Sequence, residues 1–253
     1  KQNKYLNLVG LHCHTGSNQK SYKNYLKGID EIILLMKELK EIYNIDIEII
    51  NLGGGFGVKN ITPYKMKDFA KNFIDRTLGR PFVFSHTNFN FELVSKRIVD
   101  YLQRALSENK LGSPVLMLEP GRSLVGNSTH LIASIIGIKR TSKNNWVIID
   151  AGTNLIQILT LYSEFHDIET TSNSKQKVKV SLCGPLLYSA DIIANDLELN
   201  KPEVGDLVIV KNTGAYFNCQ SNQFLYPLPA TVLLMRSKKN KVIQKRETVE
   251  DVL

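Results

Sequence analysis

The sequence contains no run of about eighteen apolar residues, the length that a membrane-spanning helix needs. Its first residues show neither the apolar core nor the small-residue cleavage site of a signal peptide. Cysteine is scarce, and Cys13, Cys183 and Cys219 lie too far apart for a disulfide framework or a paired-cysteine zinc site. These absences lead us to expect a soluble, cytoplasmic protein without a metal site.

An excess of positive charge is the one bulk property that would favour nucleic-acid binding. Lysine and arginine number 32 against 24 acidic residues, which gives a formal net charge of +8. The lysines are spread along the chain, as on an ordinary solvated surface, and gather only in short clusters. We therefore expect no nucleic-acid partner, while binding of small anionic ligands stays open.

Three short apolar runs in the first half, at residues 8–14, 47–55 and 114–121, predict strands. Two apolar stripes at helical spacing lie between them; they consist of Tyr22, Leu26, Ile29, Ile33 and Met36, and of Val94, Ile98, Leu102 and Ala105. Strands that alternate with helices favour parallel pairing with right-handed crossovers. This part therefore predicts an α/β arrangement.

The second half has a different texture. β-Prone runs at residues 131–138, 146–149, 178–182, 207–210 and 231–235 are separated by polar turns. Residues 169–177 are polar and predict a surface loop. We expect the chain to divide into an α/β part over residues 1–124 and an all-β domain over residues 125–253.

Three strand–helix units cannot close an eight-stranded barrel, which needs about 250 residues by itself. The three predicted strands are either the last three of such a barrel or a small open sheet. The pattern alone leaves both interpretations open.

The carboxyl ends of parallel strands carry the working groups of α/β folds, and here they read GLHCHTGS, NLGGGFG and LEPGRS. Gly53, Gly54 and Gly55 remove every side chain from one turn, so that backbone N–H groups can approach an anion. A tight turn without a ligand is the alternative. The forked guanidinium of Arg122 and the hydroxyl of Ser17 favour the phosphate interpretation.

Glu119 ends an otherwise apolar strand, where an ionised carboxylate is costly without a cationic partner. Arg122 is one candidate partner, and a protonated ring nitrogen of a ligand is the other. His14 is either a histidine packed in the core or one that stacks face-on against a cofactor ring. The residues by themselves leave both pairs of alternatives open.

The strings GLHCHTGS, NLGGGFG and EPGRSLV are followed by DAGTN and LY between Asp150 and Tyr162, and then by GPLLYSADIIA, PEVGDLVIV, GAY, PLPATVLL and RETVEDVL. In this order and spacing they resemble the fold-type III pyridoxal-phosphate (PLP) decarboxylases, the diaminopimelate/ornithine decarboxylase family. The resemblance covers nearly the whole chain.

That resemblance implies the last strands of an alanine-racemase-like (β/α)8 barrel followed by a β-barrel or sandwich domain. It also implies a homodimer with shared active sites and PLP as the cofactor. His14 would stack on the ring, and Glu119 would keep the pyridine nitrogen protonated, which makes the ring an electron sink. The implied phosphate contacts are Ser17, Gly53, Gly54, Gly55, Arg122 and Tyr216, and Gly121 is a further implied cofactor contact.

The sequence departs from the family's pattern where the substrate is handled. The family's cofactor-binding lysine lies on an early barrel strand, in a short Tyr-x-x-Lys-like segment, and that strand is absent here, so we expect either a fragment or a second chain that supplies the missing half. Leu187 and Tyr188 stand where the family has a proton-donating cysteine and an acid. Leucine cannot donate a proton, which leaves Tyr188 as a substitute donor.

The arginine that binds the distal carboxylate in diaminopimelate decarboxylases corresponds to Ile158, while Tyr162 is retained. Two lost charges argue against diaminopimelate and favour decarboxylation of another amino acid. The implied substrate contacts are Arg122, Tyr162, Tyr188 and Tyr216. Two alternatives stay open: a non-catalytic paralogue that binds partner proteins, and a PLP enzyme that carries out transamination.

Overall fold

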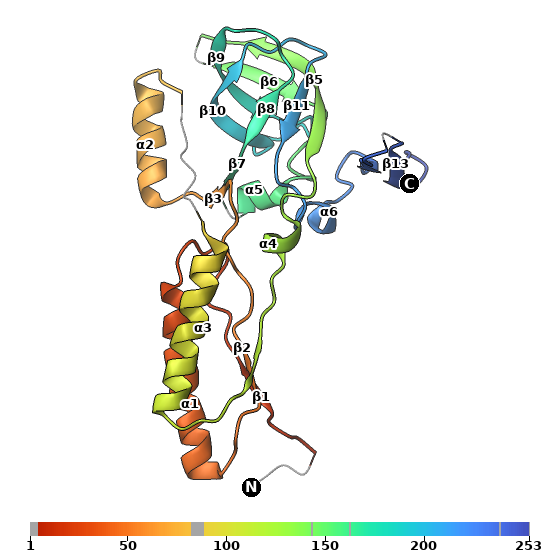
Figure 1. Cartoon of the computed structure of the whole chain (residues 1–253). Coiled ribbons are helices and arrows are strands. Elements are labelled where there is room, and N and C mark those ends of the chain that lie inside the picture. Colours follow the sequence, from red (N-terminus) through yellow and green to blue (C-terminus); the bar gives the residue numbers. More distant parts are fainter. Residues whose placement is uncertain (1–4, 82–88, 143, 162, 238, 253) are drawn as a thin grey trace. The chain divides into compact units, whose positions relative to one another are not determined.

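The structure is a computed structural model and describes residues 5–81, 89–142, 144–161, 163–237 and 239–252 (Figure 1). The chain divides into two units. The first consists of Lys1–Thr62 and His86–Gly126, and the second of Pro63–Ser85 and Asn127–Leu253. Residues 63–85 thus belong to the second unit, although the sequence on both sides of them belongs to the first.

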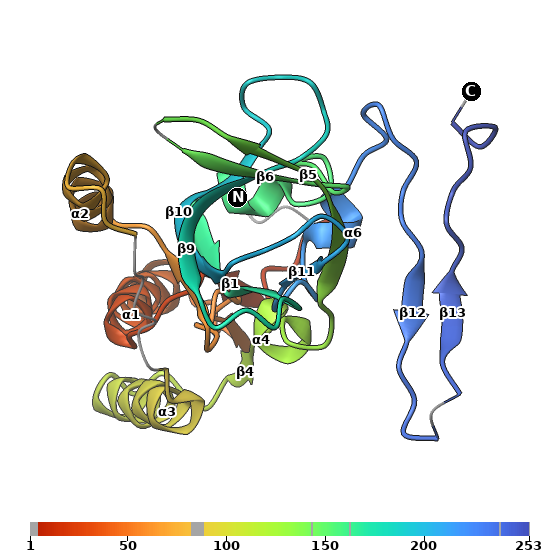
Figure 2. The same cartoon turned by 90° about the horizontal axis from the view of Figure 1, so that it is seen from above.

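The first unit is a three-stranded parallel sheet with two long helices. Its strands β1 (Gly10–His12), β2 (Ile49–Asn51) and β4 (Val115–Met117) lie in the order β1-β2-β4. Helices α1 (Lys23–Tyr43) and α3 (Phe91–Glu108) lie side by side along this sheet (Figures 1 and 2). The predicted alternation is confirmed, although each strand is shorter than the apolar run that predicts it.

The register of this sheet separates a face that packs against the helices from the opposite face. Leu11, Ile50 and Leu116 are paired across the strands and pack with α1 and α3. Side chains alternate along a strand, so the next paired row, His12, Asn51 and Met117, lies on the opposite face. Because the helices cover one face of the sheet, only side chains of the opposite face remain available to a ligand.

The second unit is built on a six-stranded sheet in the order β10-β9-β6-β5-β11-β8. Its strands are β5 (Leu131–Arg140), β6 (Asn145–Ile149), β8 (Ile168–Thr170), β9 (Lys177–Cys183), β10 (Ile192–Asn200) and β11 (Leu207–Val210). The edge strands β10 and β8 contact each other, so the sheet is nearly closed around an apolar core (Figure 2). Four of the predicted β runs are confirmed within this sheet.

Smaller elements complete the described part of the chain. They are β3 (Ile61–Pro63), α2 (Met66–Thr77), α4 (Arg122–Val125), α5 (Gln157–Leu161), β7 (Glu164–His166), α6 (Phe217–Gln220), β12 (Thr231–Leu233) and β13 (Lys241–Gln244). The fifth predicted run corresponds to β12, which pairs with β13 in a separate hairpin. The elements that were not predicted are β3, α2, α4, α5, β7, β8, β10, α6 and β13.

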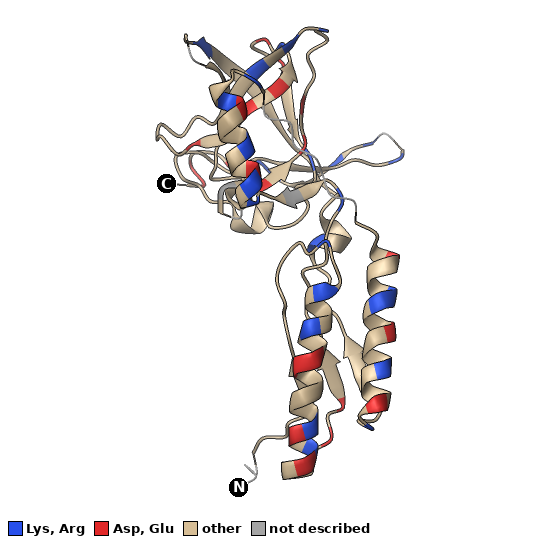
Figure 3. Ribbon diagram, turned by 90° about the vertical axis from the view of Figure 1, so that its left-hand side faces the viewer, with Lys and Arg blue, Asp and Glu red and all other residues tan. Residues whose placement is uncertain are grey.

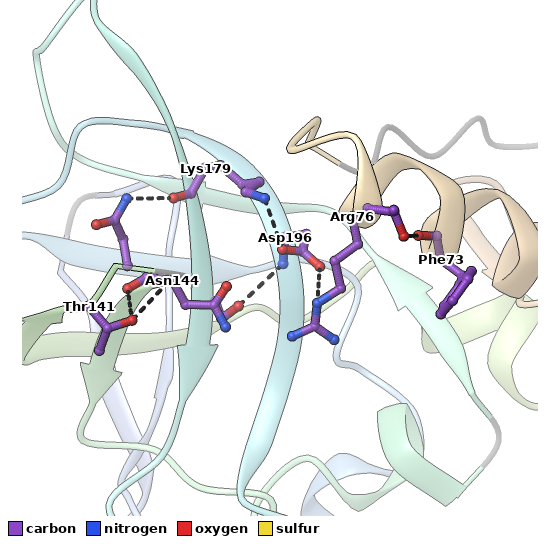
Figure 4. A network of polar contacts seen from close by, with 9 residues as sticks. Phe73, Arg76, Thr141, Asn144, Lys179 and Asp196 are labelled. Carbon is purple, nitrogen blue, oxygen red and sulfur yellow. Dashed lines mark hydrogen bonds and ion pairs between the residues drawn. The ribbon is translucent and has the colours of Figure 1, made fainter.

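Strand β10 escaped prediction because a carboxylate interrupts its apolar run. Asp196 is 1% exposed, at a position where the register of β10 shifts. Figure 4 shows that two cations face it: Arg76 Nε of α2 lies 3.5 Å from Oδ2, and Lys179 Nζ of β9 lies 3.6 Å from Oδ1. A buried carboxylate requires such partners. The ion pair with Arg76 therefore ties α2 to the sheet.

Charges of both signs alternate along the helices of the first unit. On α1 and α3, basic and acidic residues are interspersed along the helix length (Figure 3). Neither helix carries a block of like charge, and Arg104 Nε lies 3.9 Å from Glu108 Oε1, an ion pair at i,i+4 spacing.

A second buried carboxylate, that of Asp191, joins two loops of the second unit. Its Oδ1 accepts hydrogen bonds from the Thr153 N–H (2.8 Å) and hydroxyl (3.1 Å), and its Oδ2 accepts one from the Leu186 N–H (2.8 Å). A Cβ at Gly184 would lie 2.4 Å from Oδ2. Asp191 therefore fixes the GPLLYSAD loop against the DAGTN loop.

We predict that Asp191→Ala lowers the free energy of unfolding by at least about 3 kcal/mol, because three donors lose a charged, buried acceptor. Denaturant unfolding of the protein measures this. Asp206→Ala is the control: it removes a carboxylate that accepts a hydrogen bond from the Glu203 N–H at 2.8 Å, at a cost of about 1 kcal/mol. Equal losses in the two variants would contradict the assignment.

Candidate active site

The carboxyl ends of the three parallel strands meet at one edge of the first unit. His14 follows β1, the glycine turn 53–55 follows β2 and Glu119 follows β4. The Gly54 N–H donates to Nδ1 of His14 at 3.3 Å, and the Glu119 N–H donates to the Gly53 carbonyl at 2.9 Å. The structure therefore brings together three of the features that the sequence analysis singled out.

The glycine turn requires glycine for two reasons. Gly53 and Gly55 have φ values of +64° and +77°, which L side chains rarely adopt. A Cβ would also lie 2.9 Å from His14 Nδ1 at Gly53, 2.3 Å from the Glu119 carbonyl oxygen at Gly54, and 1.7 Å from the Gly16 carbonyl oxygen at Gly55. The backbone here is packed against both neighbouring strand ends.

A buried tyrosine, to which the sequence analysis gave no role, supports this turn. The Tyr25 hydroxyl donates to the Gly54 carbonyl at 2.9 Å, and its ring stacks on Phe56 with 5.2 Å between centroids. Burial raises the pKa of Tyr25 to about 12, so the hydroxyl remains a donor at neutral pH. The Gln19 N–H adds a bond to the Gly55 carbonyl at 2.8 Å.

Glu119 differs from expectation in its exposure and in its partners. Its side chain is 54% exposed, so the expectation of a buried carboxylate that needs a cation is wrong. Its Oε1 accepts a hydrogen bond from Asn51 Nδ2 at 2.7 Å and lies 3.7 Å from His12 Nε2. Within the described residues these two side chains, rather than Arg122, contact the carboxylate.

Asn51 and His12 were both missed by the sequence analysis. The Asn51 Oδ1 also accepts a hydrogen bond from the Gly53 N–H at 2.8 Å. Both residues end their strands, and the spacing of two between His12 and His14 places these side chains on the same face. Their polar side chains at the ends of apolar strands were the signal available in the sequence. That signal does not show which strands are neighbours, so it does not show which groups these side chains contact.

The other candidates of the first unit lie near the turn or near Glu119 in sequence. A Cβ at Gly55 would lie 3.4 Å from the Ser17 Cα, so Ser17 is adjacent to the turn, and its side chain is exposed. Gly121 is exposed and precedes Arg122, the half-buried first residue of α4. A Cβ at Gly121 would meet nothing within 4 Å.

The remaining candidates belong to the second unit. Tyr188 is half-exposed, with its hydroxyl hydrogen-bonded to Thr153 Oγ1 and its ring edge-on to Phe224 at 6.0 Å. Tyr216 is 42% exposed and precedes α6 with a φ of +72°. Tyr162 lies outside the described residues.

The positions that depart from the family's pattern have contrasting environments. Leu187 is 95% exposed with a φ of +60°, whereas Ile158 is 2% exposed within the apolar core. Cys183 ends β9, and burial together with the Asp191 carboxylate raises the pKa of its thiol. The Gly184 N–H donates a hydrogen bond to the Asp191 carbonyl, which closes the loop between these two residues. Leu187 lies within this loop, whereas Cys183 precedes it as the last residue of β9.

Among the described residues, no helix combines the length and the hydropathy of a membrane span. In the same part of the chain, histidine, cysteine and acidic side chains form no group of three or more that could hold a metal ion.

Known proteins resemble this chain over nearly its whole length. Diaminopimelate decarboxylase of Methanocaldococcus jannaschii is 32% identical over 98% of the chain and 51% of its own length. The enzyme of the same name from Aquifex aeolicus is 26% identical over 98% of the chain and 52% of its own length. The chain therefore spans about half the length of the curated relatives that it matches.

Solved structures agree with this resemblance. The crystal structure of the M. jannaschii diaminopimelate decarboxylase superposes with a TM-score of 0.78 at 31% identity, over 98% of this chain and 52% of that one. The same enzyme has been solved in co-complex with L-lysine, again with a TM-score of 0.78. The family described as "Pyridoxal-dependent decarboxylase, C-terminal sheet domain" matches residues 27–214. Because that match covers well over half of the sequence, the chain belongs to the pyridoxal-dependent decarboxylase family.

Proposed function

We propose that this chain is part of a PLP-dependent amino-acid decarboxylase and that its first unit binds the cofactor. The observation that carries the proposal is the meeting of the glycine turn 53–55, His14 and the Glu119 carboxylate at one strand edge. Family membership supports the same reaction class. The cofactor would supply an electron sink for the bond that breaks when CO2 leaves.

The residues at this edge fit PLP at both of its polar ends. At the turn, the Gly53 and Gly54 N–H groups are bonded to Asn51 and His14, whereas the described residues offer the Gly55 N–H no acceptor. That N–H, on a backbone without Cβ atoms, suits a phosphate oxygen. Ser17 and Arg122 from the same unit complete the proposed phosphate contacts there, and Gly121 is a further proposed cofactor contact. The resemblance to the family adds Tyr216 to the proposed phosphate contacts.

The other end of the site suits a protonated pyridine nitrogen. Both contacts of the Glu119 carboxylate fall on Oε1, so Oε2 can accept a charge-assisted hydrogen bond from a ring N–H. An anionic partner of this kind holds a proton at the ring nitrogen. The exposed His14, whose Nδ1 is turned to the Gly54 N–H, presents an imidazole for stacking.

The first unit also has features of an incomplete barrel. Parallel sheets are normally covered on both faces. Here Val115 and Met117 of β4 are 64% and 46% exposed in the described chain. We propose that residues 1–124 are the last strands of an alanine-racemase-like (β/α)8 barrel and residues 125–253 a C-terminal β-domain, in a cytoplasmic homodimer with shared active sites.

This proposal places the cofactor-binding lysine outside the 253 residues of this chain. The curated relatives are about twice as long as the stretch that they share with it. Residues beyond this stretch, or a second chain, would supply the lysine.

The substrate is proposed to be an amino acid with a less polar distal end than diaminopimelate. Leu187 carries no proton to donate, and Ile158 is buried in the core, so neither contributes a charge to a substrate. The relatives are named for diaminopimelate, and one is solved with L-lysine. Tyr188, Tyr216, Arg122 and Tyr162 are the proposed substrate contacts, with Tyr188 as proton donor.

We predict that the whole protein, supplied with PLP, releases CO2 from at least one amino acid and does so more slowly from diaminopimelate. Lysine, ornithine, arginine and apolar amino acids form the panel, and carboxyl-labelled substrates provide the measurement. Bound PLP without CO2 from any amino acid would overturn the proposal in favour of a non-catalytic paralogue. Accumulation of pyridoxamine phosphate as the main product would overturn it in favour of transamination.

A second prediction concerns the glycine turn. Gly55→Ala weakens PLP binding by at least about tenfold, because the new methyl group displaces the Gly16 carbonyl from the turn. Gly112→Ala is a matched control: its φ of +76° carries a similar strain, but its Cβ would meet nothing within 4 Å. Titration of each variant with PLP measures the effect, and equal affinities would contradict the assignment of this turn.

A further inference from the structure

One side-chain amide joins the glycine turn to the Glu119 carboxylate. The Asn51 Oδ1 accepts a hydrogen bond from the Gly53 N–H at 2.8 Å, and Asn51 Nδ2 donates to Glu119 Oε1 at 2.7 Å. Under the proposed function, the turn meets the cofactor's phosphate and the carboxylate meets its ring nitrogen. A single residue therefore contacts the protein groups at both ends of the proposed site.

The position of Asn51 in the sheet explains why its side chain contacts both Gly53 and Glu119. β2 is the central strand, and register pairs Asn51 with His12 on one side and Met117 on the other. Glu119 lies two residues beyond Met117 and so on the same face. The last side chain of the central strand is thus positioned between the ends of its neighbours.

The contacts on Glu119 leave one of its oxygens available. Asn51 Nδ2 and His12 Nε2 both approach Oε1, at 2.7 Å and 3.7 Å. The described residues provide Oε2 with no hydrogen-bond partner. Because the side chain is 54% exposed, packing does not fix its rotamer, and the hydrogen bond from Asn51 is what orients it.

The amide of Asn51 offers one acceptor and one donor in fixed relative positions. Aspartate would keep the acceptor for the Gly53 N–H but would place a second carboxylate against Glu119, where like charges repel. Alanine would remove both interactions. Comparing the two substitutions therefore separates the effect of the hydrogen bond to Gly53 from that of the hydrogen bond to Glu119.

We infer that Asn51 is a positioning residue, which sets the Glu119 carboxylate at a fixed distance from the phosphate-binding turn, with His12 as a secondary contact on the same oxygen. This inference rests on the proposed function. It assigns Asn51 no contact with the reacting atoms; its effect on the cofactor passes through Gly53 and Glu119.

The test measures the binding of three ligands to the whole protein. They are PLP, its 1-deaza analogue, in which a C–H replaces the ring nitrogen, and pyridoxal, which lacks the phosphate. The ratio of the dissociation constants of the deaza analogue and PLP reports the ring-nitrogen contact. The corresponding ratio for pyridoxal and PLP reports the phosphate contact.

Asn51→Ala is expected to lower both ratios by about tenfold, since it removes a hydrogen bond at each end. Asn51→Asp and Glu119→Ala are expected to lower only the ring-nitrogen ratio. Asn90→Ala is the control: it removes a side-chain bond to the Leu93 N–H (2.9 Å) at the start of α3 in the same unit, and it leaves both ratios unchanged. A merely structural role would weaken all three ligands equally and change neither ratio.

Wild-type ratios in both Asn51 variants would overturn the inference and leave the proposed function standing. If Asn51→Ala does not fold, Asn51→Asp decides alone: a lowered ring-nitrogen ratio with an unchanged phosphate ratio supports the inference, and any other pattern overturns it. A wild-type protein that binds the three ligands equally would overturn the proposed function, and the positioning role with it.

Discussion

Gly55 approaches the Gly16 backbone so closely that a Cβ at this position would lie 1.7 Å from the Gly16 carbonyl oxygen. This contact draws the end of the central strand β2 against the segment that follows β1, while Gly54 packs in the same way against the Glu119 carbonyl. Only a chain without side chains can run between its two neighbours here. His14, Glu119 and the Gly55 N–H, to which the described residues offer no acceptor, share one edge because the turn permits this approach.

The glycine turn is also held by hydrogen bonds from both faces of the sheet. Tyr25 of α1 reaches the Gly54 carbonyl from the packing face of the sheet, and burial raises the pKa of its hydroxyl to about 12. Asn51 holds the turn from the opposite face. The turn is therefore bonded on both sides, and its conformation is determined by the protein.

Residue type alone carried part of the information. The glycines, His14 and Glu119, which the structure brings to one strand edge, were singled out because polar or glycine residues after an apolar run are unusual. Asn51 and His12 were missed because their role depends on the strand order β1-β2-β4, which places β2 in the centre. Strand β10 was missed because Asp196 breaks its apolar run, and its cationic partners come from α2 and β9, remote in sequence. The spacing of Met66, Phe69 and Phe73 could have indicated α2.

In the second unit, one of the sequence strings that resemble the family contains a residue that stabilises the fold. Asp191 belongs to the GPLLYSAD string, and its carboxylate accepts hydrogen bonds from the N–H and hydroxyl of Thr153 and from the Leu186 N–H. Leu187, in the same loop, is 95% exposed and contributes no such bond. The bonds that hold this loop therefore do not depend on the side chain of Leu187.

A crystal structure of the whole protein with PLP bound tests the central claim most directly. The account predicts Glu119 Oε2 within about 2.7–3.2 Å of the pyridine nitrogen and a phosphate oxygen at the Gly55 N–H. A phosphate bound away from the glycine turn, or a pyridine nitrogen that faces any group other than Glu119, would contradict it.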